Sequence, residues 1–170
     1  MLKHLKYLKY LLLHKYWVFY AGLKLKVSIW RLLIHDWSKF LPCEWFAYTN
    51  YFYGNHPKFS ELPSALKSIW PAKSCEEYWK DKFDFSWNHH SKFNKHHFQF
   101  WVLIEDSGKI KPLKMPEKYV REMTADWEGA GRAITGKWEA WDYYQKNKEN
   151  TLLHPESREL FERLLRNFKP

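Results

Sequence analysis

The stretch IWRLLIHDWSKF, residues 29–40, indicates both the fold and the chemistry of this chain. With the residues before it, its apolar run predicts a helix over residues 23–36. The run closes on His35 and Asp36, and Lys39 follows three residues after the aspartate. These groups are either a polar helix end or a set of side chains that holds something charged.

Composition favours one folded domain made mainly of helices. The chain has 170 residues, of which 45% are apolar and 20% aromatic, so it can bury a core and is not disordered. Glycine is scarce, and we expect an all-α, single-domain bundle over residues 1–170. The net charge of +9 favours an anionic partner, such as a nucleotide, a nucleic acid, a phosphorylated metabolite or an anionic membrane. Cys43 and Cys75 are too few for a disulfide framework and fit the cytoplasm.

The segment upstream of the HD pair predicts a basic amphipathic helix over residues 2–20, ended by Gly22. We interpret it as packing on the core, with docking on a membrane surface as the alternative. Lysines recur through it and no small-residue cleavage site follows, so it is not read as a signal peptide. No stretch reaches the ~18 apolar residues that span a bilayer.

The rest of the chain continues the helical pattern. One β-like segment, residues 101–113, predicts a small hairpin that turns at Asp106–Gly108. The histidine-rich segment 89–97 is either one helix or two helix ends around a turn at Asn94. Further helices are expected at residues 42–53, 63–70, 74 through the 80s, 116–131, 137–147 and 155–167, with a loop at 54–63.

The histidines are the strongest chemical signal. There are nine, and they gather beside Asp36 and in residues 89–97. Imidazoles and carboxylates together suit divalent Zn, Mn, Fe, Co, Ni or Mg, and a bundle brings such ligands together from facing helices. The interpretation as a solvated polar stretch fits two histidine doublets and an HD pair poorly. The candidate ligands are His14, His35, Asp36, His89, His90, His96, His97 and Asp126, with two from the 89–97 cluster as the modest expectation.

Three basic residues are candidates for binding substrate phosphate. Lys39 shares a side with His35 and Asp36 if the helix continues that far; the alternative is a solvated lysine. GRAITGK, residues 131–137, has the spacing of a phosphate loop, but tryptophan follows it and no strand precedes it. It is therefore a false match, although Arg132 and Lys137 still stand close in sequence to Asp126. Glu122, one helical turn before Asp126, is a candidate partner or ligand.

A histidine on one helix, an HD pair on the next and an aspartate on a much later helix resemble the HD-domain metal-dependent phosphohydrolases. HDWSK has the HD-x-x-K form common there, and the extra histidines resemble its two-metal members. More closely, HDWSKF, NHHSKFNKHHFQFW and MPEKYVREMTADWEGAGRA are similar to an uncharacterised family of phages and bacteria, over about residues 14–155. The resemblance implies an HD-like bundle in which His14, His35, Asp36 and Asp126 bind a first ion, and the 89–97 histidines a second. Gln99 departs from it, where an acidic residue is expected.

These observations lead to the hypothesis of a phosphohydrolase or phosphodiesterase that uses one or two divalent ions to activate water. Asp36 and Lys39 are the expected catalytic residues, and Lys39, Arg132 and Lys137 would contact phosphate oxygens. A phosphate-containing small molecule is the expected substrate, with nucleotides favoured, including cyclic or oligonucleotide messengers.

Two alternatives stay open. The first is a non-catalytic basic module that binds nucleic acid or an acidic protein and carries a structural metal. The second is a protein docked on a membrane surface through its first helix. The expected location is the cytoplasm of a bacterium or of a phage-infected cell.

Overall fold

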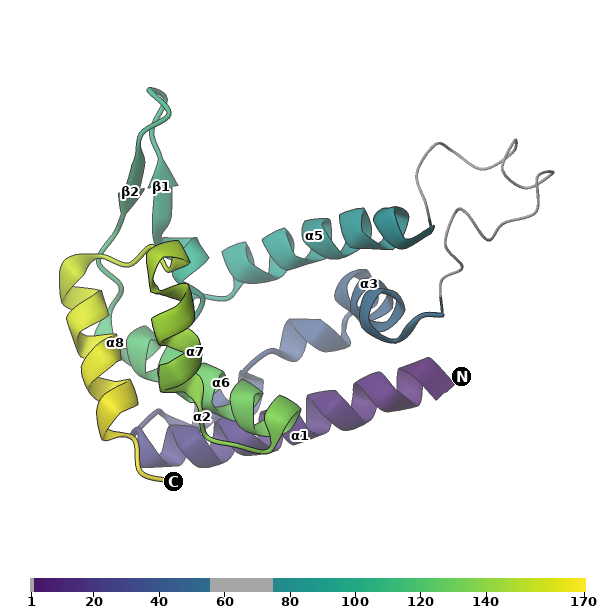
Figure 1. The fold of residues 1–170 in the computed structure, drawn as a ribbon, viewed down its shortest axis with the longest axis horizontal. Helices are drawn as coiled ribbons and strands as arrows, with labels where there is room; N and C mark the ends of the chain where they lie inside the picture. Colours follow the sequence, from purple (N-terminus) through teal and green to yellow (C-terminus); the bar gives the residue numbers. More distant parts are fainter. Residues whose placement is uncertain (1, 56–74) are drawn as a thin grey trace. The chain divides into compact units, whose positions relative to one another are not determined.

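The computed structural model describes residues 2–55 and 75–170. These residues are mainly helical and include one small two-stranded sheet (Figure 1), which confirms the all-α prediction. The chain divides into two compact units, the first made of Met1–Lys9 and Trp37–His90, the second of Tyr10–Asp36 and Ser91–Pro170. The expectation of a single domain stays a prediction.

The first unit has a core rich in aromatic side chains. The rings of Tyr7 and Trp45 meet edge to face with centroids 4.9 Å apart, and those of Tyr51 and Phe83 stack at 4.5 Å; such pairs add to the energy of apolar burial. The elements of this unit are the start of α1 (Leu2–Lys24), η1 (Trp37–Phe40), α3 (Pro42–Tyr53) and most of α5 (Cys75–Phe93). The expected loop at 54–63 lies mostly, and the helix at 63–70 wholly, outside the described residues.

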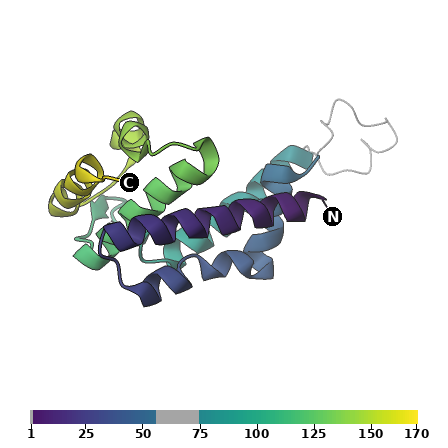
Figure 2. The same ribbon diagram turned by 90° about the horizontal axis from the view of Figure 1, so that it is seen from below.

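The second unit contains the rest of α1, which a turn joins to the short helix α2 (Figure 2). Helices α6, α7 and α8 pack on one another around buried Met123, Tyr144 and Phe161. A further core of buried residues includes Val18 of α1 and Leu32 of α2. The bounds are α2 (Ile29–Ile34), η3 (Phe98–Trp101), β1 (Val102–Ile104), β2 (Ile110–Pro112), α6 (Glu117–Thr135), α7 (Ala140–Asn147), η4 (Lys148–Asn150) and α8 (Pro155–Asn167).

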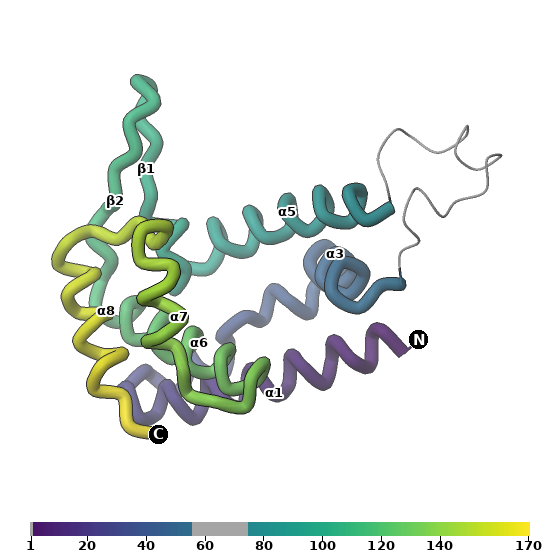
Figure 3. The backbone as a smooth tube through the Cα atoms, viewed as in Figure 1, coloured from purple at the N-terminus to yellow at the C-terminus, as the bar shows by residue number. Residues whose placement is uncertain are grey.

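The predicted hairpin is present and projects away from α7 and α8 (Figures 1 and 3). Strands β1 and β2 pair antiparallel with Leu103 opposite Lys111. Gly108 has a φ of 81° in the turn between them, which a residue without a Cβ adopts at no steric cost. Of the two alternatives for residues 89–97, the structure has the turn at Asn94, since α5 ends at Phe93 and η3 begins at Phe98.

Two helices were expected to end at glycines, the first at Gly22 and the one from residue 116 at Gly129–Gly131. Both continue past those glycines, so the predicted ends are wrong. Helix α1 runs through Gly22, where an added Cβ would stand 2.2 Å from the Cδ2 of Leu32. Helix α6 runs through Gly129, where an added Cβ would stand 2.5 Å from the backbone nitrogen of Val18. Both glycines let a neighbouring segment approach the helix closely. Helix α6 ends instead at Gly136, with a φ of 75°.

None of the helices in the described part of the chain is long and apolar enough to cross a lipid bilayer.

Candidate metal centre

The HD pair lies on a backbone bend. The helix predicted over residues 23–36 is shorter than expected, because α2 ends at Ile34 and His35 is its C-cap, with φ −52° and ψ 129°. Asp36 has a φ of 53°, in the left-handed region that aspartate enters more readily than most residues. The helical spacing that would have put Lys39 beside the pair is therefore absent. Lys39 lies in the first unit, buried, with its Nζ 5.9 Å from the centroid of the Tyr48 ring.

Within the second unit, three separate segments bring His14, His35, Asp36 and Asp126 together. His14 comes from the buried face of α1, the HD pair from the end of α2, and Asp126 from α6. One ligand atom from each lies within 4.8 Å of the others, and all four residues are buried. His14 Nε2 is 3.2 Å from Asp36 Oδ2 and 3.3 Å from Asp126 Oδ1, while His35 Nε2 is 3.2 Å from Asp126 Oδ1. Two imidazoles and two carboxylates at this spacing match the donor set of a divalent transition-metal ion.

Asp36 also faces a second pair of histidines. His96 Nε2 is 3.2 Å from its Oδ1 atom, the oxygen turned away from His14. Ligand atoms of Asp36, His96 and His97 lie within 4.8 Å of one another, and the two imidazole rings have centroids 4.2 Å apart. The carboxylate of Asp36 therefore has one oxygen toward His14 and His35 and the other toward His96. This is the arrangement by which one carboxylate can bridge two ions.

Glu122 contacts the Nδ1 atoms of two histidines of the cluster. Its Oε1 atom is 3.3 Å from His35 Nδ1 and 3.4 Å from His96 Nδ1. Its other oxygen accepts a hydrogen bond from Arg31 of α2. An imidazole that donates through Nδ1 to a carboxylate is fixed in orientation and presents Nε2 to a metal. The candidate partner of Asp126 is thus a partner of the two histidines.

Burial and charge shift the pKa values in opposite directions across the cluster. Burial opposes the charged form of His35, but the charge of Asp36 and hydrogen bonds to Asp126 and Glu122 outweigh it and raise the pKa to about 10. Burial, together with the charge of His35, lowers the pKa of His96. Burial would raise the pKa of Asp126, yet hydrogen bonds from His14 and His35 hold it well below its usual range. The cluster therefore stabilises the charged form of His35 beside its carboxylates and disfavours the charged form of His96.

His89 and His90 lie in the first unit, where both contact Glu44. His90 Nδ1 is 2.8 Å from Glu44 Oε2 and His89 Nδ1 is 3.1 Å from Glu44 Oε1. Ser38 donates a hydrogen bond to the same glutamate, which is fully buried. Burial would raise the pKa of Glu44, but the hydrogen bond and charge of His90 lower it. The Nδ1 atoms of both histidines are thus directed at a carboxylate that holds them in place.

The two basic candidates near the end of α6 have different surroundings. The guanidinium of Arg132 lies 5.0 Å from the centroid of the Trp17 ring and donates a hydrogen bond to the carbonyl of Gly136. This side chain thus covers the C-terminus of α6 and stacks on an aromatic ring. Lys137 follows the helix and is exposed. Neither belongs to the buried cluster, and their phosphate contacts stay a prediction.

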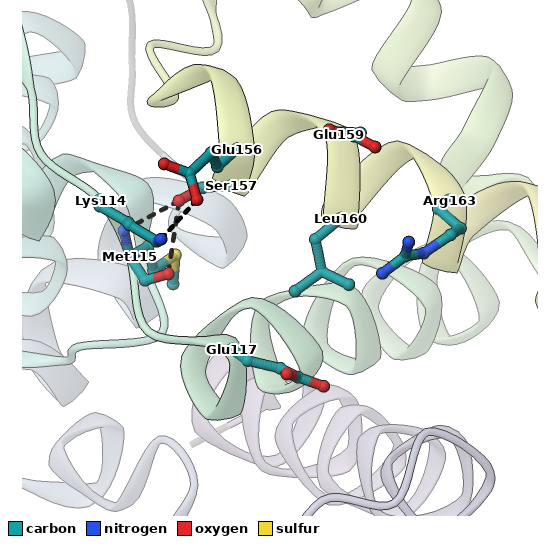
Figure 4. Close-up of a pocket in the computed structure, with 8 residues that line it drawn as sticks. All are labelled: Lys114, Met115, Glu117, Glu156, Ser157, Glu159, Leu160 and Arg163. Atoms are coloured by element: carbon teal, nitrogen blue, oxygen red, sulfur yellow. Dashed lines mark hydrogen bonds and ion pairs between the residues drawn. The ribbon is translucent and has the colours of Figure 1, made fainter.

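A pocket of about 280 Å³ opens elsewhere in the second unit (Figure 4). Its lining is Lys114, Met115, Glu117, Glu156, Ser157, Glu159, Leu160 and Arg163. Lys114 and Glu156 form an ion pair across it, and Ser157 donates a hydrogen bond to the carbonyl of Met115. No histidine or aspartate of the buried cluster lines this pocket, so it is not the candidate centre.

Two polar residues that the sequence reasoning missed support the histidines. Arg31 donates a hydrogen bond to Glu122, 91 residues away in the sequence. Glu44 forms hydrogen bonds with His89 and His90, 45 and 46 residues away. Arg31 stands inside an apolar run and Glu44 in the first turn of a helix, where a carboxylate is ordinary. The one available signal was the apolar setting of Arg31, because a lone charge in such a run needs a partner.

Comparison with known proteins assigns the chain to a family. It matches a family of unknown function, DUF5662, over residues 3–167 and belongs to that family. No curated protein and no solved structure matches the chain. The family carries no assigned activity, so a functional conclusion has to come from the residues of the cluster.

Proposed function

We propose that this protein is an HD-type metal-dependent phosphohydrolase whose centre is built on Asp36. The observation that carries the proposal is the convergence of His14, His35, Asp36 and Asp126 in one buried cluster of the second unit. Divalent ions bound there would supply Lewis-acid activation of water and of a phosphoryl oxygen. The favoured substrates are nucleotides or other phosphate esters, in keeping with the net charge of +9.

The chain's own residues divide the task. Asp36 directs one oxygen toward His14 and the other toward His96, and so is suited to hold two ions at once. Glu122 orients His35 and His96 through their Nδ1 atoms, which leaves the Nε2 atoms to act as ligands. The burial of every member keeps water from competing for the carboxylates and strengthens their interaction with a cation.

The same burial supports one alternative, a structural metal in a non-catalytic binding module. Asp126, the most exposed of the four residues, has only 8% of its surface accessible, and a closed ligand set without open positions is typical of structural sites. In that case the ion would tie α1, α2 and α6 together and no ester would be cleaved.

Elemental analysis of the purified full-length protein, followed by phosphate-ester assays with Mn, Ni or Mg, tests the proposal. Asp36→Asn is the matched variant, because asparagine also adopts the left-handed backbone while its amide removes the charge. We expect the wild type to retain metal and hydrolyse an ester, and the variant to lose both while keeping its helical circular-dichroism spectrum.

Metal without any hydrolysis would favour the structural alternative. A wild-type protein that binds no divalent ion at neutral pH would overturn both readings.

A further inference from the structure

Helix α1 carries an apolar stripe on the side that faces away from the core. In the part that belongs to the second unit, His14 and Val18 are buried, whereas Leu12, Tyr16 and Leu23 are 54%, 60% and 48% exposed. At about 100° per residue, these three exposed positions fall on one narrow side of the helix, opposite the buried pair. A helix at a protein surface usually turns a polar face outward, so this stripe lacks an ordinary explanation.

Helix α2 adds to the exposed apolar surface. Leu32 points inward against Gly22 of α1, while Trp30 and Ile34 are 76% and 67% exposed. Ile29 and Leu33 are also exposed. Figure 2 shows α2 next to the C-terminal half of α1, with no other element of the second unit in front of the two. An exposed cluster of large apolar side chains marks an interaction surface.

The charged side chains that the hairpin itself contributes to this surface have a single sign. The chain has no aspartate or glutamate before Asp36, and lysines occur throughout that segment. Lys15 lies between the two helices, where its Nζ donates to the carbonyl oxygen of His35 at 2.5 Å. Lys24 and Lys26 are exposed at the turn. Lysines at the edge of an apolar stripe can cover it with their methylene groups and extend their ammonium groups to anions.

We propose that the α1–α2 hairpin of the second unit docks on an anionic lipid surface, with Leu12, Tyr16, Leu23 and the exposed side chains of α2 in the apolar layer. Apolar side chains flanked by lysines are the composition of helices that lie in a membrane interface, and each lysine there adds attraction to anionic head groups. The docked orientation would leave His14, on the opposite side of α1, turned away from the lipid. This inference does not depend on the proposed function.

Other occupants fit the surface less well. A second copy of the chain would bring the same lysine-rich hairpin against itself, and like charges across an interface are unfavourable. Nucleic acid would meet the lysines, and Tyr16 and Trp30 could stack on bases. The exposed leucines and isoleucines, however, neither stack on bases nor bind phosphate, so most of the apolar surface would be left without a partner. An anionic lipid surface satisfies both the apolar and the basic side chains.

Co-sedimentation of the full-length protein with vesicles tests this docking. The vesicles are phosphatidylcholine alone or phosphatidylcholine with phosphatidylglycerol. We expect binding to the anionic vesicles only, and a loss of about tenfold or more in affinity for the double variant Leu12→Gln/Trp30→Gln, which removes two exposed apolar contacts. Ile134→Gln is the matched control, since Ile134 is 68% exposed on α6, and it should bind as the wild type does.

Light scattering of the same proteins measures their oligomeric state and so tests whether a second copy of the chain covers this surface. Absence of wild-type binding, equal binding to neutral vesicles, or an equal loss in the Ile134→Gln control would overturn the proposal. If the wild type is a dimer, the double variant is a monomer, and the wild type does not bind vesicles, the surface would be assigned to a second copy of the chain instead.

Discussion

Two polar networks of the second unit use the same kinds of carboxylate with different partners. In the network around Glu162, Oε1 accepts a hydrogen bond from Tyr144 at 2.8 Å and lies 2.8 Å from Lys148 Nζ, and Oε2 lies 3.0 Å from Arg166. Ammonium and guanidinium groups keep their protons at neutral pH. Glu162 therefore has permanent cations beside it and has no need of an ion.

In the candidate metal centre, the partners are imidazoles. Asp126 meets the Nε2 atoms of His14 and His35, and Asp36 meets those of His14 and His96. An imidazole nitrogen that has lost its proton offers a lone pair, and metal binding releases such a proton. The same carboxylates are thus beside groups that can change from donor to ligand. The partner of an acid, more than the acid itself, therefore decides whether such a network is closed or open to a metal.

The largest expected effect is that of Asp126→Asn. The change keeps the shape of the side chain and removes a charge and a ligand oxygen, so we expect the metal affinity to fall by more than about 100-fold and ester hydrolysis to fall with it. Isothermal titration with Mn and metal content after dialysis measure the loss. Glu162→Gln, the equivalent change in the closed network, should retain the wild-type metal content. If the two variants lost metal to the same extent, the two networks would not differ in metal binding.

A smaller effect is expected for Glu122→Gln. The amide can no longer hold both His35 and His96 through their Nδ1 atoms, so we expect metal affinity to fall about 10- to 100-fold while the fold is retained. Titration with Mn measures it, and near-ultraviolet circular dichroism reports the packing. Wild-type affinity in this variant would show that the two imidazoles do not need the glutamate for their orientation.

Gly129→Ala tests the packing that supports the candidate metal centre, because α6 carries Asp126 and approaches α1, which carries His14. The new methyl group would meet the Val18 backbone at 2.5 Å, and overpacking of this kind costs about 1–3 kcal/mol. Thermal unfolding should therefore occur at a temperature lower by about 2–4 °C per kcal/mol.

Gly131→Ala is the matched control for that change. Its Cβ would come only within 3.7 Å of the Lys137 carbonyl, so the helix gains up to about 1 kcal/mol from the replacement of glycine. If Gly129→Ala also stabilised the protein, the close contact between α1 and α6 would be disproved.

The smallest expected effect is the stability change of Glu162→Gln. The hydrogen bond from Lys148 lowers the pKa of Glu162, so its charge stabilises the fold above the usual glutamate pKa, and that contribution is lost as the pH falls through the lowered value. At neutral pH we expect a loss of about 0.5–1 kcal/mol in urea unfolding, shrinking in acid. A loss that does not depend on pH would assign the effect to packing.

The sequence was sufficient for the helical class, the hairpin and the grouping of His14, His35, Asp36 and Asp126. That grouping was predicted from the histidine clusters and the resemblance to HD-domain proteins, because His14 and Asp126 taken alone look like an ordinary histidine and an ordinary helix carboxylate. The ends of α1 and α6 were wrong at Gly22 and Gly129, because glycine in a sequence does not reveal whether a neighbouring helix approaches it.

The backbone bend at Asp36 and the pairing of charged residues around the histidines could not be predicted from sequence patterns either. The bend at Asp36 depends on one backbone angle, which helical spacing does not encode. Arg31 and Glu122 meet across 91 residues. The apolar run around Arg31 indicates that it needs a partner, and Glu122 is a candidate partner of Asp126, but neither segment shows that the two residues pair with each other. Long-range pairing of this kind follows from the packing of α2 and α6, and not from either segment alone.

The left-handed backbone at Asp36 narrows which amino acids position 36 can hold. Glycine, asparagine and aspartate enter that conformation with little strain, while β-branched side chains are excluded. Of the three tolerated residues, aspartate alone carries a negative charge. In a saturation library at this position we therefore expect glycine, asparagine and aspartate to retain the fold best, and aspartate to be the one of these three that also retains the proposed metal binding.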